Sequence, residues 1–317
     1  MSDQDSQSAF PPHVPVLYQL VLSALSIKGS GFYVDATLGA GGHACGILDA
    51  CEPDGRLLGL DVDPQALAIA SRRLTVYGER AIIRRASYAT LSQRLAEVGV
   101  AAGTVDGILI DLGASSMQFD TPERGFSFQA DGALDMRFDP GLPQTAADLV
   151  NDLGEQELAD ILWRYGEETH SRRIARAILQ ARPLHTTRQL AEVVQRAVPR
   201  KGGRSLHPAT LTFQALRIAV NQELQAIESF LPQAVTALAP GGRLVVISFH
   251  SLEDRLVKHF LRRESRDCIC PPQQPVCTCG HKASLHEVTR HPLVADETEI
   301  QSNPRSRSAK LRVAEKL

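Results

Sequence analysis

The stretch FYVDATLGAGGHACGILDA, residues 32–50, decides the fold. It begins with a short apolar run, which predicts a strand, and its glycines between positions 39 and 42 predict a tight turn. The residues after the turn, up to Ala50, predict a helix. A strand that ends in a glycine turn and leads into a helix is the first unit of a nucleotide-binding α/β sheet.

Further strand–helix units follow and predict a doubly wound sheet. Asp63 is a suitable N-cap and Pro64 a suitable first residue for the helix after the second strand. Residues 105–110 are continuously apolar, as expected of a parallel strand that is covered on both faces. Strands are expected at 56–60, 81–83 and 105–110, and helices at 64–74 and 91–98.

The alternation stops after the fourth strand, and helices take its place until a fifth apolar strand at 243–249. We therefore expect a discontinuous sheet domain, 1–115 and 208–317, that is interrupted by an inserted all-helical domain, 116–207. Helices are expected at 155–165, 171–180, 187–198, 208–238 and 252–263, and further strands near 287–289 and 310–314.

The composition is that of an ordinary globular protein. With 43% hydrophobic and 22% charged residues, the 317-residue chain is not disordered as a whole. A formal net charge of −2 argues against an indiscriminate polyanion binder. No apolar run approaches the roughly 18 residues of a membrane span, and the polar N-terminal segment does not resemble a signal peptide. Six cysteines are too few for a disulfide scaffold, so we expect a soluble cytoplasmic protein without a membrane partner.

The glycine turn and a later acid predict an adenosine-type cofactor. Gly39, Gly41 and Ala44 satisfy the loose fingerprint G-x-G-x-x-G/A between a strand and a helix. Asp61 lies 19 positions after Gly42, at the end of the second strand, where an acid that bonds a ribose diol is expected. The alternative is a tight turn followed by a capping acid.

Three acids at strand ends favour S-adenosylmethionine over a dinucleotide. Asp35, Asp61 and Asp111 each end a predicted parallel strand, so they should meet at one edge of the sheet. Their charges suit the sulfonium and ammonium of the methyl donor and would repel a pyrophosphate. A nicotinamide-dependent oxidoreductase and a non-catalytic RNA-binding module with a vestigial pocket are the competing hypotheses.

Motifs across most of the chain resemble those of the bacterial ribosomal RNA small subunit methyltransferase H family. The resemblance implies methyl transfer from S-adenosylmethionine to N4 of a cytidine in the decoding region of 16S rRNA, in the small ribosomal subunit. It also implies a class I methyltransferase (Rossmann-like) sheet with an inserted helical substrate-recognition domain. The motifs are DATLGAGGH (35–43), DVDPQA (61–66), DGILIDLG (106–113), ERGFSF (123–128), LDMR (134–137), HPAT (207–210), SFHSLEDR (248–255) and NPR (303–305).

The resemblance also implies a set of donor-binding residues. Asp61 would bind the ribose, and Tyr88, at a position where the family often has Phe, would lie against the adenine. Met117 stands where the family commonly has Pro, directly before Gln118. The full implied set is Gly41, Gly42, His43, Asp61, Tyr88, Asp111 and Gln118.

The chemistry of an exocyclic amine gives Asp111 a second candidate role. The lone pair of cytosine N4 is conjugated into the ring, so catalysis depends on alignment and on acceptors for the N4 hydrogens. Asp111 is such an acceptor, although the aromatic clamp of many amino-methylating enzymes does not follow it. The sequence leaves open whether Asp111 acts on the amine or only on the donor.

Substrate contacts are predicted at three places. His250 follows the fifth strand and would orient the base or contact a phosphate, unless it is only an internal hydrogen-bonding residue. Asp135 and Arg137 lie in a turn-rich stretch that should border the cleft. The basic run at the end of the insertion is either a solvated face or an RNA-binding surface, and it consists of Arg196, Arg200, Lys201 and Arg204.

Four cysteines fall within twelve residues near the C-terminus. Cys268, Cys270, Cys277 and Cys279 could hold a tetrahedral zinc ion, but C-x-C is tighter than the usual C-x₂-C spacing. Zinc and a reduced, metal-free loop are equally compatible with the sequence. The oligomeric state is also left open, a homodimer included.

Overall fold

The computed structural model describes residues 15–198, 207–271, 273–274 and 276–317. The chain divides into two compact units. The sheet unit comprises residues 1–61, 65–112 and 230–317, and the helical unit comprises 62–64 and 113–229. None of the helices within the described ranges has both the length and the apolar character that crossing a membrane requires.

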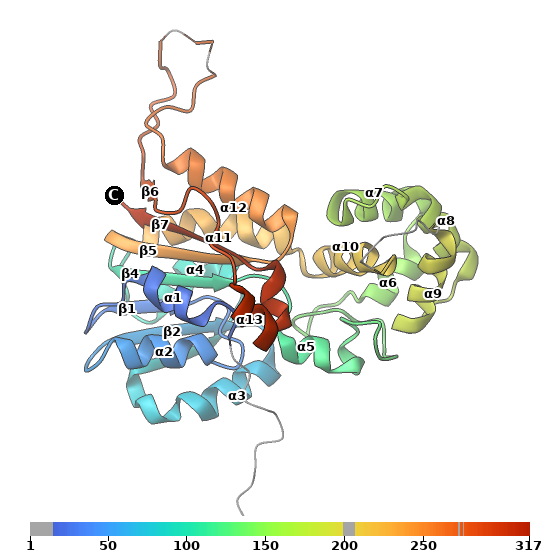
Figure 1. The fold of residues 1–317 in the computed structure, drawn as a ribbon, viewed down its shortest axis with the longest axis horizontal. Helices are drawn as coiled ribbons and strands as arrows, with labels where there is room; N and C mark the ends of the chain where they lie inside the picture. The colour runs from blue at the N-terminus through green and yellow to red at the C-terminus, as the bar shows by residue number, and fades with distance from the viewer. Residues whose placement is uncertain (1–14, 199–206, 272, 275) are drawn as a thin grey trace, which may run out of the picture. The chain divides into compact units, whose positions relative to one another are not determined.

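The sheet unit is built on seven strands in the order β3-β2-β1-β4-β5-β7-β6 (Figure 1). The first five strands in this order are parallel, whereas β7 is antiparallel to both of its neighbours. The strands are β1 (Phe32–Asp35), β2 (Arg56–Asp61), β3 (Ala81–Arg85), β4 (Val105–Asp111), β5 (Leu238–Ser248), β6 (Leu285–Glu287) and β7 (Lys310–Lys316).

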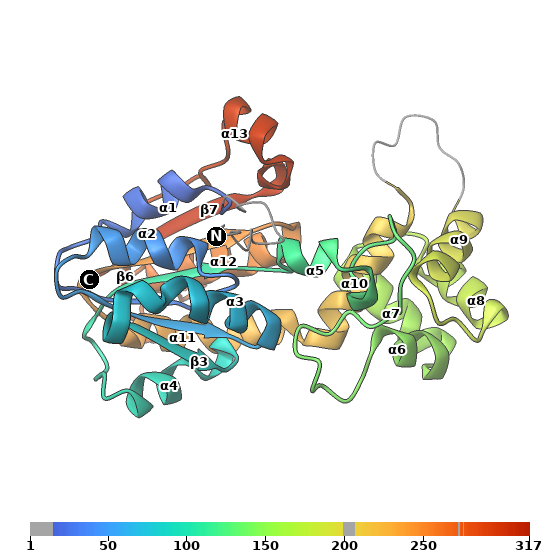
Figure 2. The same cartoon turned by 90° about the horizontal axis from the view of Figure 1, so that it is seen from below.

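Helices cover both faces of this sheet, as the continuously apolar β4 requires. Figure 2 shows α1 and α2 on one face, with α4 and α11 on the other. Ile47 of α2, Leu57 of β2 and Leu109 of β4 are fully buried in the core beneath α1 and α2. The helices are α1 (Tyr18–Leu25), α2 (Gly42–Ala50), α3 (Pro64–Leu74), α4 (Leu91–Glu97), α11 (Glu223–Ala237), α12 (Ser251–Glu264) and α13 (Glu297–Ser302), and the 3₁₀ turns are η1 (Thr75–Arg80), η2 (Tyr88–Thr90) and η4 (Pro304–Ser308).

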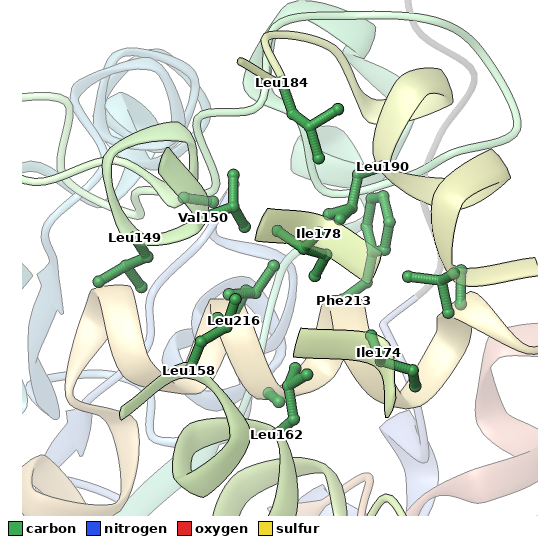
Figure 3. Packing of buried hydrophobic residues seen from close by; sticks show 14 of the residues in the cluster. Leu149, Val150, Leu158, Leu162, Ile174, Ile178, Leu184, Leu190, Phe213 and Leu216 are labelled. Atoms are coloured by element: carbon green, nitrogen blue, oxygen red, sulfur yellow. The ribbon is translucent and has the colours of Figure 1, made fainter. Parts of the chain in front are cut away.

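The helical unit has its own apolar core (Figure 3). Leu158 and Leu162 lie four residues apart on α7, and Ile174 and Ile178 are spaced likewise on α8, so each pair faces inward from one side of its helix. Its helices are α5 (Ser116–Asp120), α6 (Ala146–Asp152), α7 (Glu155–Gly166), α8 (Ser171–Ala181), α9 (Thr187–Ala197) and α10 (Ala209–Asn221), with the 3₁₀ turn η3 (Pro122–Arg124).

The predicted continuous helix over 208–238 is wrong. The chain breaks at Gln222, whose φ of 50° is left-handed, so α10 and α11 are separate helices. Glu223, directly after the break, is buried and ion-paired with Arg217, with 2.8 Å between Oε1 and Nε. β5 also begins at Leu238, five residues before the expected strand.

The boundary between the two units also differs from the expected one. The helical unit continues to Ser229, beyond the expected end of the insertion at residue 207. The reason is that α10 adds Phe213 and Leu216 to the core of the helical unit. The return to the sheet therefore occurs within α11.

Candidate active site at the ends of the parallel strands

The glycine turn after β1 is shaped by backbone constraints. Gly41 is the N-cap of α2 with a φ of 78°, a left-handed conformation that favours glycine. A Cβ on Gly42 would lie 2.5 Å from Cγ of Pro15, so a larger residue would force a rearrangement. The N–H of Gly39 donates to Oδ2 of Asp61 at 2.7 Å. The turn is thus fixed to the end of β2.

Asp35, Asp61 and Asp111 end three neighbouring strands, because β1 pairs with both β2 and β4. Thr37 links two of these ends. Its N–H donates to Oδ1 of Asp35 at 3.2 Å, and its Oγ1 accepts a hydrogen bond from the N–H of Asp111 at 2.7 Å. The structure therefore gathers the three acids at one edge of the sheet, as their spacing predicted.

The electrostatics of this edge favour a bound cation. Burial raises the pKa of Asp35 to about 7. The hydrogen bond from the N–H of Thr37 lowers this pKa, and the charge of Asp61 raises it further. Burial also raises the pKa of Asp111 well above its ordinary value, and the charges of Asp35 and Glu253 add to this. Within the described ranges, Oδ1 of Asp111 is buried and has no hydrogen-bond partner. A positive ligand group would stabilise this carboxylate, so the site fits a sulfonium donor.

Two predicted donor contacts are ring-bearing side chains of the sheet unit. His43 is buried near the start of α2, and its ring stacks on Tyr18 with 6.0 Å between centroids. Tyr88 begins η2 after β3 and meets Phe230 edge to face, with 5.5 Å between centroids. Both rings are therefore held by aromatic contacts, and their roles toward the donor remain predictions.

Gln118 lies in the helical unit and is buried there. Its Nε2 donates to Oδ2 of Asp63 at 2.9 Å, and its Oε1 accepts from the N–H of Ser115 at 2.9 Å. Arg124 also donates to Oδ2 of Asp63, at 2.7 Å. Asp63, which itself belongs to the helical unit, therefore accepts hydrogen bonds from two buried side chains of that unit, a role beyond the helix cap that the sequence indicated.

Asp135 and Arg137 form an internal ion pair in the structure. Nε and Nη2 of Arg137 donate to the two carboxylate oxygens at 2.8 and 2.7 Å, and Nη1 donates to the carbonyl of Leu142 at 2.6 Å. Burial alone would raise the pKa of Asp135, but the hydrogen bonds from Arg137 outweigh it and lower that pKa. Met136, between them, has a φ of 64°. The pair holds a left-handed turn, which is a structural role alongside the predicted substrate contact.

His250 is the N-cap of α12. Its Nδ1 accepts from the N–H of Glu253 at 3.4 Å, while its Nε2 lies 3.1 Å from Oε1 of Glu253. Glu253 is fully buried, and its Oε2 accepts from the N–H of Phe249 at 2.8 Å. Sequence reasoning missed Glu253, although its place three residues after a helix cap is a capping-box signal.

Of the four residues in the predicted basic run, one lies within the described part of the structure. Arg196 is on α9 and pairs with Glu192, with 2.8 Å between Nη2 and Oε2. Its other members, Arg200, Lys201 and Arg204, lie outside the described residues. The four clustered cysteines lie between α12 and β6 in the sheet unit.

These features define a class I S-adenosylmethionine-dependent methyltransferase. The parallel strands have the order of that fold, β7 is antiparallel, and the glycine turn lies against the acids at the strand ends. The predicted fold class is therefore confirmed. The sequence supports the same conclusion, because it matches the MraW methylase family over residues 11–317, and the chain belongs to that family.

Curated relatives agree closely in length and sequence, and each of the following is named ribosomal RNA small subunit methyltransferase H. The chain is 52% identical over 309 residues to the protein of Geobacter sulfurreducens, covering 96% of this chain and 99% of the relative. It is 52% identical over 308 residues to that of Carboxydothermus hydrogenoformans, covering 96% and 98%. For a protein of Dehalococcoides mccartyi, the identity is 51% over 309 residues, covering 96% and 87%.

Proposed function

We propose that this enzyme transfers the methyl group of S-adenosylmethionine to the exocyclic N4 of a cytidine in the decoding region of 16S rRNA. The observation that carries the donor assignment is Oδ1 of Asp111, which is buried and has no hydrogen-bond partner in the part of the chain that the structure describes, next to Thr37. The target rests on the relatives named as ribosomal RNA small subunit methyltransferases. We place the reaction in the cytoplasm, on RNA of the small ribosomal subunit.

The donor supplies a methyl group on a positively charged sulfur, and the chain supplies the pocket. We assign Gly41 and Gly42 to the place where the backbone at the start of α2 comes close to the donor. Neither position admits a side chain without strain or a clash. Asp61, which fixes the turn by accepting from the N–H of Gly39, would also accept from the ribose hydroxyls. Tyr88, braced by Phe230, would cover the adenine, and the assignment extends to His43 and Gln118.

The chain can promote the transfer in two ways. Holding the N4 nitrogen in line with the methyl carbon removes most of the entropic cost of the encounter. An acceptor for the N4 hydrogens also takes up positive charge as it develops on the amine. Asp111 is suited to this because, once a cation lowers its raised pKa, it presents an ionised oxygen with no partner among the described residues. A role limited to donor binding is the alternative.

RNA binding is assigned to the helical unit and to a basic cavity on the sheet unit. Phosphate contacts position RNA without supplying chemistry, so basic side chains away from the strand ends suit this role. The target base must leave its stack to reach the donor. The cavity measures about 350 Å³ and is lined by Arg262, Ser265, Arg266, Glu287, Arg290 and His291.

Calorimetry with purified protein tests the donor assignment. S-adenosylmethionine should bind and NAD should not. Asp61→Ala should weaken donor binding by about 1.5–3 kcal/mol, because the ribose hydroxyls lose a charged acceptor. Asp54→Ala, at an exposed position before β2, is the matched control and should bind normally. Tight NAD binding without donor binding would overturn the proposal in favour of an oxidoreductase.

A further inference from the structure

The segment between α12 and β6 is a long loop that extends beyond α12 (Figure 1). Its base is fixed by hydrogen bonds: the N–H of Ser284 donates to the carbonyl of Glu264 at 2.8 Å, and Nε2 of His281 lies 3.0 Å from the carbonyl of Arg263. Among the described residues further out, the large apolar side chains are not buried: Ile269 and Val276 are 44% and 69% exposed. Another interaction must fix the outer part if the loop has one conformation.

The four cysteines of this loop converge on one point. The Sγ atoms of Cys268, Cys270, Cys277 and Cys279 all lie within 4.8 Å of one another. The Cys277–Cys279 separation is 3.6 Å, and the Cys279–Cys268 separation is 3.9 Å. Four thiolates in a tetrahedron around Zn²⁺, each about 2.3 Å from the metal, stand about 3.8 Å apart. The sulfurs are therefore already at the spacing of a zinc site.

The same distances argue against other uses of the thiols. A disulfide needs about 2.05 Å between sulfurs, and all four cysteines are free. An iron–sulfur cluster places several iron and sulfide atoms between its cysteines and would hold them further apart. The backbone also supports thiolate ligands, since the N–H of Cys270 donates to Sγ of Cys268 at 3.4 Å. Hydrogen bonds of this kind orient metal ligands.

We propose that Cys268, Cys270, Cys277 and Cys279 bind one Zn²⁺ as a structural site that fixes this loop. Four thiolates fill the tetrahedral coordination, so the site has no open position for a substrate or a water nucleophile. The function of the zinc ion is to hold the outer part of the loop in one conformation, because side-chain burial there is insufficient to do so. The site resolves the choice between zinc and a metal-free loop that the sequence left open, and it is independent of the proposed methyl transfer.

Metal analysis of the full-length protein, purified under reducing conditions, tests the proposal. Wild type should retain about one zinc per chain through dialysis and release it when a mercurial modifies the thiols. Cys277→Ala combined with Cys279→Ala should reduce the zinc content to about a tenth or less. Cys45→Ala removes a half-buried thiol of α2 outside the cluster, and should keep the full zinc content.

Two further readouts do not depend on methyltransferase activity. Cobalt substituted for zinc should give the absorption of four thiolate ligands, and this should disappear in the double variant. Zinc removal should speed tryptic cleavage at the exposed Arg266 and Lys282, which flank the cluster. The proposal is overturned if the reduced wild type contains no metal, holds iron instead, or if the double variant keeps a full equivalent of zinc.

Discussion

Asp35→Asn should stabilise the ligand-free enzyme at neutral pH, although it alters a fully buried strand-end residue. The pKa of Asp35 rises from 3.8 in the unfolded chain to about 7 in the fold, mainly through burial. Because this acid binds its proton more tightly when folded, stability falls as pH rises from about 4 to about 7. The full effect, above about pH 7, is about 4 kcal/mol.

Asparagine keeps the shape and still accepts from the N–H of Thr37 through its carbonyl oxygen. Burial of its amide costs about 1–3 kcal/mol, so the net gain above about pH 7 should be about 1–3 kcal/mol. Below about pH 4 the gain should give way to a loss of about 1–3 kcal/mol, because both states of the wild type are then protonated and only the cost of burying the amide remains. The sign of the pH dependence is thus as diagnostic as its size.

Urea unfolding at a series of pH values measures this difference. Circular dichroism is the suitable probe, because the single tryptophan, Trp163, lies on α7 and reports the helical unit. Asp54→Asn, at an exposed position, should follow the wild-type pH profile. An Asp35→Asn variant whose stability differs from wild type by the same amount at every pH would refute the electrostatic account of this edge.

Two further predictions separate chemistry from RNA binding. Asp111→Asn should leave RNA affinity near normal but slow methyl transfer by on the order of 10²–10³, as for loss of one transition-state contact. Single-turnover transfer and filter binding measure the two quantities, and full activity would remove Asp111 from the chemistry. Conversely, alanine at the four basic residues of 196–204 should weaken RNA binding and flatten its salt dependence, with donor affinity unchanged. An unaltered salt slope would show that these side chains do not contact phosphates.

The sheet and its acids were predictable because local patterns determine them. Continuous apolar runs identified β2 and β4, and the acids at their ends needed only the rule that parallel strands end at one edge. The left-handed Gln222 was not predictable, because nothing in its neighbourhood interrupts the helical pattern. Because of that break and the packing of Phe213 in the helical core, the helical unit ends at Ser229 and not at the expected residue 207.

The electrostatic partners of the site were harder to read from sequence. Glu253 raises the pKa of Asp111 only because β4 and β5 pair and α12 starts shortly after β5. Such proximity depends on the tertiary fold, so a capping-box signal alone does not reveal it. The same holds for Asp135 and Arg137, whose ion pair depends on the left-handed backbone of Met136.

The central claim is tested most directly by identifying the methylated nucleoside. Small ribosomal subunits from cells that lack the enzyme would be incubated with the purified protein and tritium-labelled S-adenosylmethionine, and the 16S rRNA then digested to nucleosides. The account predicts label in N4-methylcytidine from the decoding region, with transfer greatly reduced for Asp111→Asn. Label on carbon 5 of cytosine, on adenine or on protein would contradict it.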